Sequence, residues 1–510
     1  MSFWFTVYLH FLVGIAEPPL IGANAALSGP RLHYRDRCRT QNCWHKKLVV
    51  QIVTVEGDNL LLCTGSDMTS SPRQLLIAPT ALDMHGRPVK QKHLHLPGLT
   101  LLMLAAVTPP HYFTRLLYET VEDIPFDEQW DIVGITGMGS GIVRAWQIAD
   151  EFRARGATVV IGGIAASLGR PEYSLEHADV LVIGEAEDIW PEILNDFERG
   201  RLQRSYQAKT PPDIATLPAP RYDLLNRPRI GFWRPVQATR GCPLPCTFCS
   251  VTAFHRAAYR KRPVEQIIRD VRLARKSGSR HITFIDDNIG VDWDYCRELW
   301  EALIPEKITW MSQCSLHIAD HPDMLALAYR SGCRLLSIGI ESLSRKNLLE
   351  VRKHWNHPEK YVRSVERIRR HGIDVSTEMI IGMDSDDADV FEQTFRFISE
   401  ARISVPRIHI LTPVPGTPLY ESFDRDKRLI HRDFGRYSGG QVVFTPALIS
   451  AEDLQRGYWD LYEKLFSWRE ILRRTWRNPA RLGILMRGIV WSTNLHYRNH
   501  VKRRITPGIV

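Results

Sequence analysis

Short apolar runs alternate with stretches of helical periodicity along most of the chain. Between residues 73 and 185 the runs have the length of buried strands and are rich in Leu, Ile and Val, and residues 142–155 repeat apolar side chains at helical spacing. This alternation predicts an α/β fold with a doubly wound parallel sheet. The predicted strands are residues 75–79, 114–118, 131–136, 158–162 and 180–184.

Glycines and small polar residues follow several of these strands. Ligands of doubly wound sheets bind at the carboxyl ends of the strands, and a missing side chain lets the backbone approach a large flat ligand. This pattern predicts a ligand site at that edge of the sheet. The candidate contacts are Gly137, Ser140, Gly162, Gly163, Gly184 and Glu185.

A second strand and helix series begins after a proline-rich segment, residues 201–230, which we interpret as a linker. Six β/α units predict a partial (β/α)6 barrel with its chemistry at the carboxyl-terminal mouth. Helical spacing is seen, for example, in residues 264–277 and 361–371. The predicted strands are residues 235–240, 281–286, 308–316, 334–340, 374–382 and 407–411.

Three cysteines lie in one short loop after the first predicted barrel strand. Cys242, Cys246 and Cys249 have the spacing Cys-x3-Cys-x2-Cys, and no fourth cysteine follows at comparable spacing. Three thiolates can hold three irons of a 4Fe-4S cluster and leave one iron open. An open iron can chelate the amino and carboxylate groups of S-adenosylmethionine (SAM) and pass an electron into its sulfonium.

Two other interpretations of these cysteines remain open. A zinc site usually takes four ligands, often in Cys-x2-Cys pairs. The other interpretation is that the three loop cysteines are structural residues of the core, although such residues need no loop that contains glycine and proline. Elsewhere in the chain, Cys296, Cys314 and Cys333 lie in apolar runs and are predicted to be buried small hydrophobes.

The cysteine spacing resembles the radical SAM superfamily. A Rossmann-like domain directly before such a loop resembles the cobalamin-binding subclass, as do the stretches Arg144-Ala-x-x-Ile-Ala149, Gly162-Gly163 and His177-Ala-Asp-x-x-x-Ile-Gly-Glu185. The resemblance implies a Rossmann-like cobalamin domain, a radical SAM barrel, a mainly helical C-terminal extension, and class B methyltransferase-like activity. The implied cofactors are a 4Fe-4S cluster, S-adenosyl-L-methionine and cobalamin.

One departure concerns the ligand of the cobalt. Standard cobalamin domains carry Asp-x-His-x-x-Gly after the first strand, and here Asp83-Met-His85-Gly-Arg-Pro88 ends in proline. His85 is therefore a candidate cobalt ligand, with an ordinary loop histidine as the alternative.

The resemblance also implies contacts with SAM at the barrel mouth. Phe248 is placed to touch the adenine, and Asp286, Asp287 and Asn288 stand where the superfamily carries a run that contacts the SAM ammonium; capping of a helix is the alternative for these three. The remaining implied contacts are Glu341 near the ribose, Gly382 in Ile380-Ile-Gly-Met383, and Thr412 in Leu411-Thr-Pro413.

Two polar side chains are predicted on the inner faces of barrel strands. Gln313 shares a face with Ser315, and Glu378 shares one with Ser376. A glutamate inside a barrel is costly unless it is paired or used, so Glu378 could contact SAM, orient the substrate, or pair with an arginine such as Arg334. Residues 413–418 either shape the substrate mouth or form a structural turn.

Composition sets the broad class of the protein. A chain of 510 residues with 44% apolar content is globular and long enough for two or three domains. Nine cysteines, three of them in the loop, favour a reducing compartment, with the cytoplasm as the default. The predicted domains are residues 68–200, 231–425 and 426–510, with the linker between the first two and an unassigned segment, residues 1–67, before them.

The net charge of +9 is concentrated near the C-terminus. Residues 466–510 contain ten Lys or Arg and one acid, Glu470, interleaved with tryptophans. This composition suggests a segment that contacts the inner face of an anionic membrane. A nucleic-acid arm is not expected because no nucleic-acid module accompanies it, and a solvated helical subdomain is the alternative.

The first 67 residues show no clear period. Residues 3–16 are apolar but too short to span a membrane and lack the basic flank of a secretory signal. A translation start at Met68 is one interpretation, and a second cluster at Cys38, Cys43 and Cys63 is another.

These observations predict a cobalamin-dependent radical SAM enzyme that methylates an unactivated carbon of a lipid-like or secondary-metabolite substrate. An external electron donor such as flavodoxin or ferredoxin would be required. The alternatives are radical oxidation, cyclisation or carbon–carbon coupling without methyl transfer, and a non-catalytic Fe-S or cobalamin sensor.

Overall fold

The structure is a computed structural model that describes residues 71–225, 227–476, 480 and 482–508. The interpretations of residues 1–67, including the translation start and the second cysteine cluster, lie outside the described residues. The described part is an α/β fold with two six-stranded parallel sheets and a mainly helical C-terminal part, which confirms the predicted fold class.

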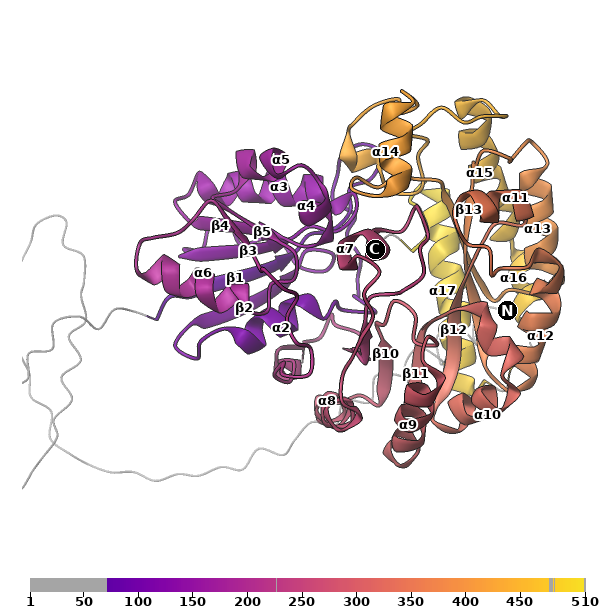
Figure 1. Ribbon diagram of the computed structural model, residues 1–510, viewed down its shortest axis with the longest axis horizontal. Helices are drawn as coiled ribbons and strands as arrows, with labels where there is room; N and C mark the ends of the chain where they lie inside the picture. The colour runs from indigo at the N-terminus through magenta and orange to yellow at the C-terminus, as the bar shows by residue number, and fades with distance from the viewer. Residues whose placement is uncertain (1–70, 226, 477–479, 481, 509–510) are drawn as a thin grey trace, which may run out of the picture. The chain divides into compact units, whose positions relative to one another are not determined.

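The first sheet has the strand order β2-β1-β3-β4-β5-β6 and is parallel throughout (Figure 1). Successive residues of β1 point to opposite faces: Leu76 joins the core formed with α2 and α6, whereas Leu75 and Ile77 join the core formed with α3. The strands are β1 (Arg73–Ala78), β2 (Phe113–Tyr118), β3 (Ile132–Thr136), β4 (Thr158–Gly162), β5 (Val180–Ile183) and β6 (Ser205–Gln207). The helices are α2 (Thr100–Val107), α3 (Gly141–Arg153), α4 (Ile164–Leu168), α5 (Pro171–His177) and α6 (Ile189–Glu198).

The segment predicted as a linker also belongs to the fold. Residues 201–230 contribute β6 to the edge of the first sheet and a 3-10 turn, Tyr222–Leu225, whose Tyr222 hydroxyl donates to the carbonyl of Pro235 at 2.7 Å. Arg227 pairs with Glu122 at 2.8 Å. Because β6 has only three residues, it shows no periodic pattern in the sequence. The linker was therefore predicted from the prolines of this segment alone.

The second sheet forms the partial barrel, with the order β14-β13-β12-β11-β10-β7 and parallel pairing throughout (Figure 1). Its strands are β7 (Trp233–Val236), β10 (His281–Phe284), β11 (Thr309–Cys314), β12 (Cys333–Glu341), β13 (Asp374–Ile381) and β14 (Val405–Ile410). Its helices are α7 (Ser250–His255), α8 (Val264–Lys276), α9 (Trp293–Leu303), α10 (Pro322–Arg330), α11 (Arg345–Glu350), α12 (Tyr361–Arg370) and α13 (Val390–Glu400).

The first predicted barrel strand, residues 235–240, is divided in two. β7 ends at Val236, and β8 (Thr239–Arg240) pairs antiparallel with β9 (Arg260–Lys261). The chain therefore leaves the barrel sheet just before the cysteine loop.

The C-terminal part contains α14 (Pro418–Arg425), α15 (Ala451–Leu465), α16 (Trp468–Thr475) and α17 (Ile484–Lys502). α17 lies against β14, the last strand of the open barrel sheet. On the same helix, the ring of His496 lies 6.2 Å from that of His95, whose neighbour Leu94 pairs with Ile230 just before β7. α17 therefore connects the two edges of the partial barrel.

Much of the basic C-terminal segment is packed into the protein. Arg474 is fully buried and donates to the carbonyl oxygens of Ile403 at 2.8 Å and Leu465 at 2.9 Å. Arg504 pairs with Glu463 at 2.9 Å. The segment is thus largely the helical subdomain that we gave as the alternative to a membrane-binding tail. In the described part of the chain, no helix is both long and apolar enough to cross a membrane.

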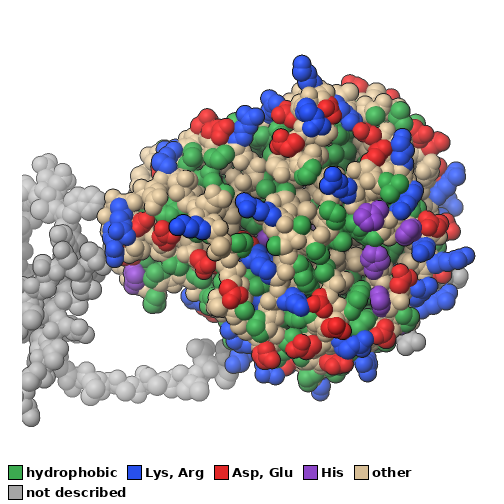
Figure 2. All heavy atoms as spheres, viewed as in Figure 1, with side chains coloured by type: hydrophobic (Ala, Val, Ile, Leu, Met, Phe, Trp, Pro, Cys, Tyr) green, Lys and Arg blue, Asp and Glu red, His purple; other side chains and the backbone are tan. Residues whose placement is uncertain are grey.

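Charge is distributed widely over the described surface. Figure 2 shows Lys and Arg side chains interspersed with Asp and Glu over the visible face, with several histidines grouped at one place and another apart from them.

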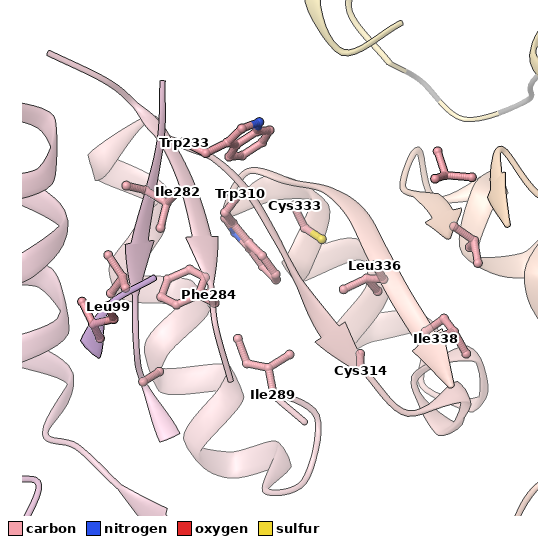
Figure 3. Close-up of a cluster of buried hydrophobic side chains, with 14 of the residues drawn as sticks. Leu99, Trp233, Ile282, Phe284, Ile289, Trp310, Cys314, Cys333, Leu336 and Ile338 are labelled. Carbon is pink, nitrogen blue, oxygen red and sulfur yellow. The ribbon is translucent and has the colours of Figure 1, made fainter. Parts of the chain in front are cut away.

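Aromatic packing stabilises the barrel core. The ring of Trp310 meets Phe284 edge to face at 5.5 Å (Figure 3) and lies 5.8 Å from the ring of Trp300. All three side chains are buried. Cys314 and Cys333 lie in the same cluster, and Cys296 is also buried. The prediction that these three cysteines serve as small hydrophobes is confirmed.

Candidate functional site

The cysteine loop lies between β8 and α7. Cys246 is buried, and Cys242 and Cys249 are half-buried. The amide of Cys249 donates to the carbonyl of Cys246 at 3.3 Å, and the amide of Thr247 donates to the carbonyl of Val351 at 3.2 Å. Gly241 has a positive φ of 85° and lies so close to the carbonyl of Ala258 that no side chain fits. These contacts fix the loop at the mouth of the barrel.

The three thiols lie close enough to influence one another. Burial raises the pKa of Cys246 to about 12, the nearby Lys353 ammonium opposes that rise, and the charges of Cys249 and Cys242 add to it. Burial also raises the pKa of Cys242. The thiols of Cys246 and Cys242 therefore keep their protons at neutral pH until coordination to a metal removes them. Three cysteines on one fixed loop are the donor set that a 4Fe-4S cluster with an open iron needs.

The zinc alternative requires several ligands around one ion. Within the described ranges, no group of three or more His, Cys, Asp or Glu side chains is arranged to hold a single metal ion, and this result includes the three cysteines of the loop.

The acidic run after β10 holds the cysteine loop in place. Asp286 is fully buried and accepts hydrogen bonds from the amides of Ala238 at 3.2 Å and Thr239 at 2.5 Å, and from the Thr239 hydroxyl at 2.6 Å. Burial raises the pKa of Asp286 to about 6, although these hydrogen bonds oppose the rise. Asp286 therefore fixes the chain before the cysteines, and its contact with the SAM ammonium stays a prediction.

The next two residues of the run also contact the loop. Asp287 accepts a hydrogen bond from the amide of Gly241 at 2.9 Å, and burial raises the pKa of its carboxyl. Asn288 lies near the thiol of Cys242 and opposes the rise in its pKa, and its side-chain oxygen accepts a hydrogen bond from the amide of Ser315 at 3.0 Å. Of these three predicted SAM contacts, only Asp287 lines the large cavity described next.

A cavity of about 790 Å³ lies between the first domain and the barrel mouth. Its wall is formed by the turns after β3, β4 and β5, by barrel residues, and by Phe434 and Tyr437 of the C-terminal part. Among the predicted contacts it is lined by Gly137, Gly163, Gly184, Glu185, Asp287 and Gln313. A volume of this size falls in the range of cofactor sites.

Glycine is required where two turns of this wall meet. Gly163 has a positive φ of 100°, and a Cβ at this position would lie 2.6 Å from the carbonyl oxygen of Gly137 and 2.9 Å from the Thr136 hydroxyl. The amide of Gly137 also donates to the carbonyl of Gly162 at 2.7 Å. At this point of the wall the two turns therefore meet through backbone atoms, with no side chain between them.

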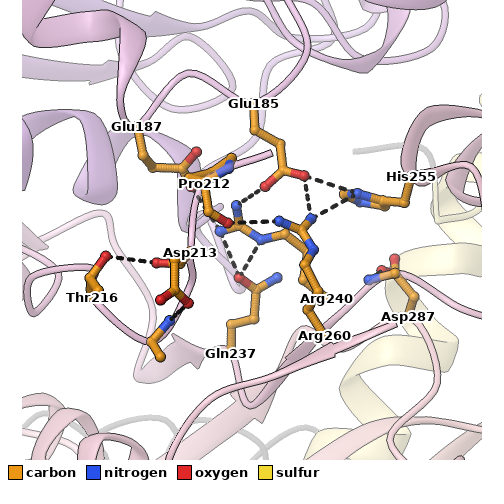
Figure 4. A network of polar contacts seen from close by, with 12 residues as sticks. Glu185, Glu187, Pro212, Asp213, Thr216, Gln237, Arg240, His255, Arg260 and Asp287 are labelled. Carbon is orange, nitrogen blue, oxygen red and sulfur yellow. Dashed lines mark hydrogen bonds and ion pairs between the residues drawn. The ribbon is translucent and has the colours of Figure 1, made fainter. Parts of the chain in front are cut away.

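Glu185 connects the first domain to the cysteine loop (Figure 4). Its carboxylate pairs with Arg240 at 2.5 Å and with Arg260, and Nδ1 of His255 lies 3.3 Å away. Burial raises the pKa of Glu185, but the hydrogen bonds from His255 and the two arginines lower it overall to about 2. Arg240 also pairs with Glu187 at 2.8 Å and directly precedes the loop. Ion pairs therefore occupy most of the carboxylate that we predicted to contact the cofactor.

The structure does not bring His85 to the cavity. Its side chain is exposed in a tight turn that is closed by the pairing of Leu82 with Pro88, where Asp83 accepts from the amides of His85 at 2.8 Å and Arg87 at 3.0 Å. His85 is not among the residues that line the cavity, so the geometry gives no support for a cobalt ligand there.

Comparison with known proteins places this site in a family. Residues 236–398 match the model of the radical SAM superfamily. The bacteriochlorophyllide d C-12(1)-methyltransferase of Chlorobaculum tepidum is 30% identical over 418 residues, which cover 80% of this chain and 89% of that protein. The chain belongs to the radical SAM superfamily.

Other relatives are similar over most of their length. The bacteriochlorophyllide d C-8(2)-methyltransferase of the same organism is 29% identical over 421 residues, covering 78% of this chain and 91% of that protein. The hopanoid C-2 methylase of Rhodopseudomonas palustris is 26% identical over 355 residues, covering 66% of each chain.

Solved structures share the fold. The methyltransferase TsrM of Kitasatospora setae, with cobalamin and a [4Fe-4S] cluster bound, superposes with a TM-score of 0.59 at 15% identity, covering 85% of this chain and 99% of that chain. The cobalamin-dependent radical enzyme OxsB, with aqua-cobalamin bound, gives a TM-score of 0.60 at 14% identity, covering 84% of this chain and 72% of that chain.

The interior of the radical SAM barrel contains a polar cluster around Glu378. The carboxylate pairs with Arg407, and Nε2 of His409 lies 3.3 Å from it. Burial raises the pKa of Glu378, but Arg407 and His409 lower it overall. The arginine partner is thus Arg407 rather than Arg334, whose guanidinium lies 4.2 Å from the ring centre of Tyr329.

The C-terminal part completes this barrel cluster. Tyr497 on α17 lies near Arg407, which opposes the rise in the pKa of the Tyr497 hydroxyl. Gly439, with a positive φ of 75°, passes so close to His409 that a Cβ there would lie 2.8 Å from Nδ1. No sequence pattern marks Tyr497 as part of this site, because only the long-range packing of α17 on β14 places it there.

Lys353 is a second residue of the site that the sequence did not reveal. Its ammonium is largely buried, lies 2.7 Å from Glu341 Oε1, and acts electrostatically on Cys246. A Cβ at Gly339 would lie 2.9 Å from the ammonium, so this pair fills the space of a side chain. Lys353 follows α11 in an irregular loop, where no pattern marks a functional lysine.

The other predicted contacts have defined positions. Phe248 is half-buried between Cys246 and Cys249. The amide of Gly382 donates to Asp386 at 2.9 Å, and the hydroxyl of Thr412 donates to the carbonyl of Ile410 at 3.0 Å. Ser140 is buried, Ser376 is buried, and Val414 and Pro415 of the loop 413–418 line the large cavity.

Proposed function

We propose that this chain is a cobalamin-dependent radical SAM enzyme that methylates an unactivated carbon. The observation that carries the proposal is its similarity to a bacteriochlorophyllide methyltransferase along nearly the whole of that protein. The cavity between the first domain and the cysteine loop supports it, as does the fold shared with two cobalamin-containing enzymes.

The residues present fit the implied cofactors. Cys242, Cys246 and Cys249 would hold the cluster, and the bare backbone at Gly137 and Gly163 would receive the corrin ring. When bound, these groups supply reductive SAM cleavage and methyl transfer, which side chains alone cannot perform.

The protein's own residues position and protect these groups. Asp286, Asp287 and Asn288 fix the cysteine loop, and the Glu185 ion pairs hold it against the first domain. Phe434 and Tyr437 from the C-terminal part cover the cavity and exclude water.

A tetrapyrrole-like macrocycle is the substrate class that we favour. The two bacteriochlorophyllide methyltransferases are more similar to this chain than the hopanoid methylase is, and the matches cover 89% and 91% of their length against 66%. The lipid interpretation rested on the C-terminal segment, most of which packs into the fold.

We expect anaerobically reconstituted protein with cobalamin, SAM carrying a deuterated methyl group, and titanium(III) citrate to methylate bacteriochlorophyllide d. The measurement is the mass of the pigment, which should increase by one labelled methyl group. A hopanoid offered under the same conditions should remain unlabelled.

Other outcomes separate the alternatives. Release of 5'-deoxyadenosine with a changed but unmethylated pigment would favour oxidation, cyclisation or coupling. Cofactor binding without SAM cleavage would favour a sensor. A labelled hopanoid with an unlabelled pigment would overturn the substrate class.

We also propose that part of α16 contacts an anionic membrane. Trp468, Leu472 and Trp476 follow one another at intervals of four residues on one side of the helix and are 53%, 42% and 71% exposed. Ile484 and Leu485 at the start of α17 are also exposed, at 87% and 46%. Arg469 and Arg473 flank the tryptophans, an arrangement that suits an anionic interface.

Replacing Trp468 and Trp476 by alanine should lower sedimentation with anionic liposomes about ten-fold or more, because each tryptophan loses roughly 2 kcal/mol of apolar burial. The matched control is the double variant Ile430→Ala/Leu448→Ala. It removes two apolar side chains that are also exposed, at 51% and 64%, but lie outside α16. Equal sedimentation of the two double variants would contradict a membrane contact at α16.

A further inference from the structure

The segment from Arg345 to Arg363 packs directly on the cysteine loop. The carbonyl of Val351 accepts the amide of Thr247, which lies between two of the cysteines, at 3.2 Å. Two residues later, Lys353 lies beside Cys246. No residue of the segment lines the large cavity, so the segment borders the cysteine loop outside the proposed cobalamin site.

The segment is strongly basic and exposed. It contains six Lys or Arg and two Glu. Five of the six basic side chains lie in exposed positions, and among the described residues none of these five forms an ion pair with a carboxylate: Arg345, Lys346, Arg352, Lys360 and Arg363. Such a surface attracts acidic partners at long range.

Apolar and imidazole groups lie among these charges. Leu349 on α11 is 52% exposed, although it is a large aliphatic residue. His317 lies near His321, His357 and Lys353, as their mutual electrostatic influence shows. A small open cavity of about 210 Å³ lies at the same place, lined by Leu244 of the cysteine loop, His317 and His321.

We propose that this basic surface, centred on Leu349 and Arg352, docks an acidic one-electron carrier protein of the flavodoxin or ferredoxin class. The inference rests on the proposed function, because the carrier serves the cluster held by the cysteines. An apolar centre within a charged rim is typical of protein interfaces, and electron-transfer contacts are small, below about 1,200 Å². Contact with the cysteine loop favours a redox partner over nucleic acid or a membrane, which would need no such proximity.

The electron balance is simple. The reduced carrier gives up one electron and leaves oxidised by one electron. The cluster that Cys242, Cys246 and Cys249 would hold would pass that electron to the sulfonium of SAM, and the bond between sulfur and C5' would break. Methionine would leave, and the 5'-deoxyadenosyl radical would take a hydrogen atom from the substrate.

The test compares two charge reversals of equal size in the reconstituted holoenzyme. The variant Lys346→Glu/Arg352→Glu changes the proposed surface. The control Lys276→Glu/Arg280→Glu changes one exposed lysine and one exposed arginine at the end of α8 and just before β10, at the amino ends of the barrel strands. A third variant, Lys346→Gln/Arg352→Gln, removes the charges without reversing them.

Two measurements are made on each variant. One is the dissociation constant for oxidised flavodoxin, which requires no turnover. The other is the rate of 5'-deoxyadenosine formation, driven either by reduced flavodoxin or by titanium(III) citrate. We expect the reversal at the surface to weaken flavodoxin binding and the flavodoxin-driven rate about ten-fold or more, with the glutamine variant between it and the wild type. The titanium-driven rate and the control should not change.

Salt provides an independent check. Raising the ionic strength from 0.01 M to 1 M shortens the Debye length from about 30 Å to about 3 Å, so the difference between wild type and the surface variant should largely disappear.

Several results would overturn the inference. The first is that the surface variant and the control bind flavodoxin equally well. The second is that the surface variant still binds flavodoxin but loses binding to duplex DNA or to anionic vesicles. If titanium(III) citrate drives no SAM cleavage in any variant, the proposed function fails, and the flavodoxin dissociation constants still decide the docking surface.

Discussion

Replacing Cys242, Cys246 and Cys249 together by alanine is expected to abolish both the iron-dependent absorbance and the release of 5'-deoxyadenosine. The three thiols lie on one fixed loop and are the ligand set proposed for the cluster. The triple variant leaves no thiolate on this loop to hold a cluster, so the loss of absorbance and of 5'-deoxyadenosine release should be complete. Iron content, visible absorbance and product release are measured on the same anaerobic preparation.

A control variant tests whether the effect is specific to the cysteines of the loop. Cys296 is buried on α9, and its thiol lies 2.9 Å from the carbonyl of Ile289. The variant Cys296→Ala should keep the cluster, with only the loss of stability expected from a small buried cavity. If the triple variant still cleaves SAM, the assignment of the three cysteines is wrong.

The second large effect is expected at Gly163. The variant Gly163→Ala would place a Cβ 2.6 Å from the carbonyl of Gly137, and both atoms belong to turns that line the large cavity. The two turns must therefore separate, which changes the surface proposed to receive the corrin. We expect cobalamin affinity to fall by at least about ten-fold, corresponding to roughly 1.4 kcal/mol. Equilibrium binding of hydroxocobalamin, followed by its visible spectrum, is the measurement.

The control separates this clash from backbone strain. Gly156 has a similar positive φ of 85°, a Cβ added there would meet no atom within 4 Å, and the residue does not line the cavity. The variant Gly156→Ala carries the strain of a left-handed residue alone, about 1–2 kcal/mol, and should bind cobalamin normally. Equal affinity of the two variants would show that the turn after β4 does not form the cobalamin site.

Local patterns in the sequence were sufficient for the fold class. The runs that became β1, β3, β4 and β5 are apolar over the length of a strand, and buried parallel strands need no long-range information to be recognised. The cysteine loop was equally readable, because its spacing lies within eight residues. Where the signal was short or irregular, as for the three-residue β6 and the division of β7 from β8, the prediction differed from the structure.

Partners far apart in the chain could not be read from the sequence. Glu378 needed an arginine, but the parallel register of β13 and β14 selected Arg407 over Arg334. The run after β10 was predicted to contact SAM, and the sequence could not show that Asp286 also accepts hydrogen bonds from the chain before the cysteines.

The sequence by itself determined the chemistry class of this protein, because the cysteine spacing and the order of its two β/α series are local properties of the chain. Only the tertiary structure decided how the site is assembled. The Glu185 ion pairs, the Lys353 ammonium beside Cys246, and the packing of α17 across the open barrel all join residues distant in sequence. Burial energy and charge pairing select such contacts only when the whole chain has folded, so no local pattern encodes them.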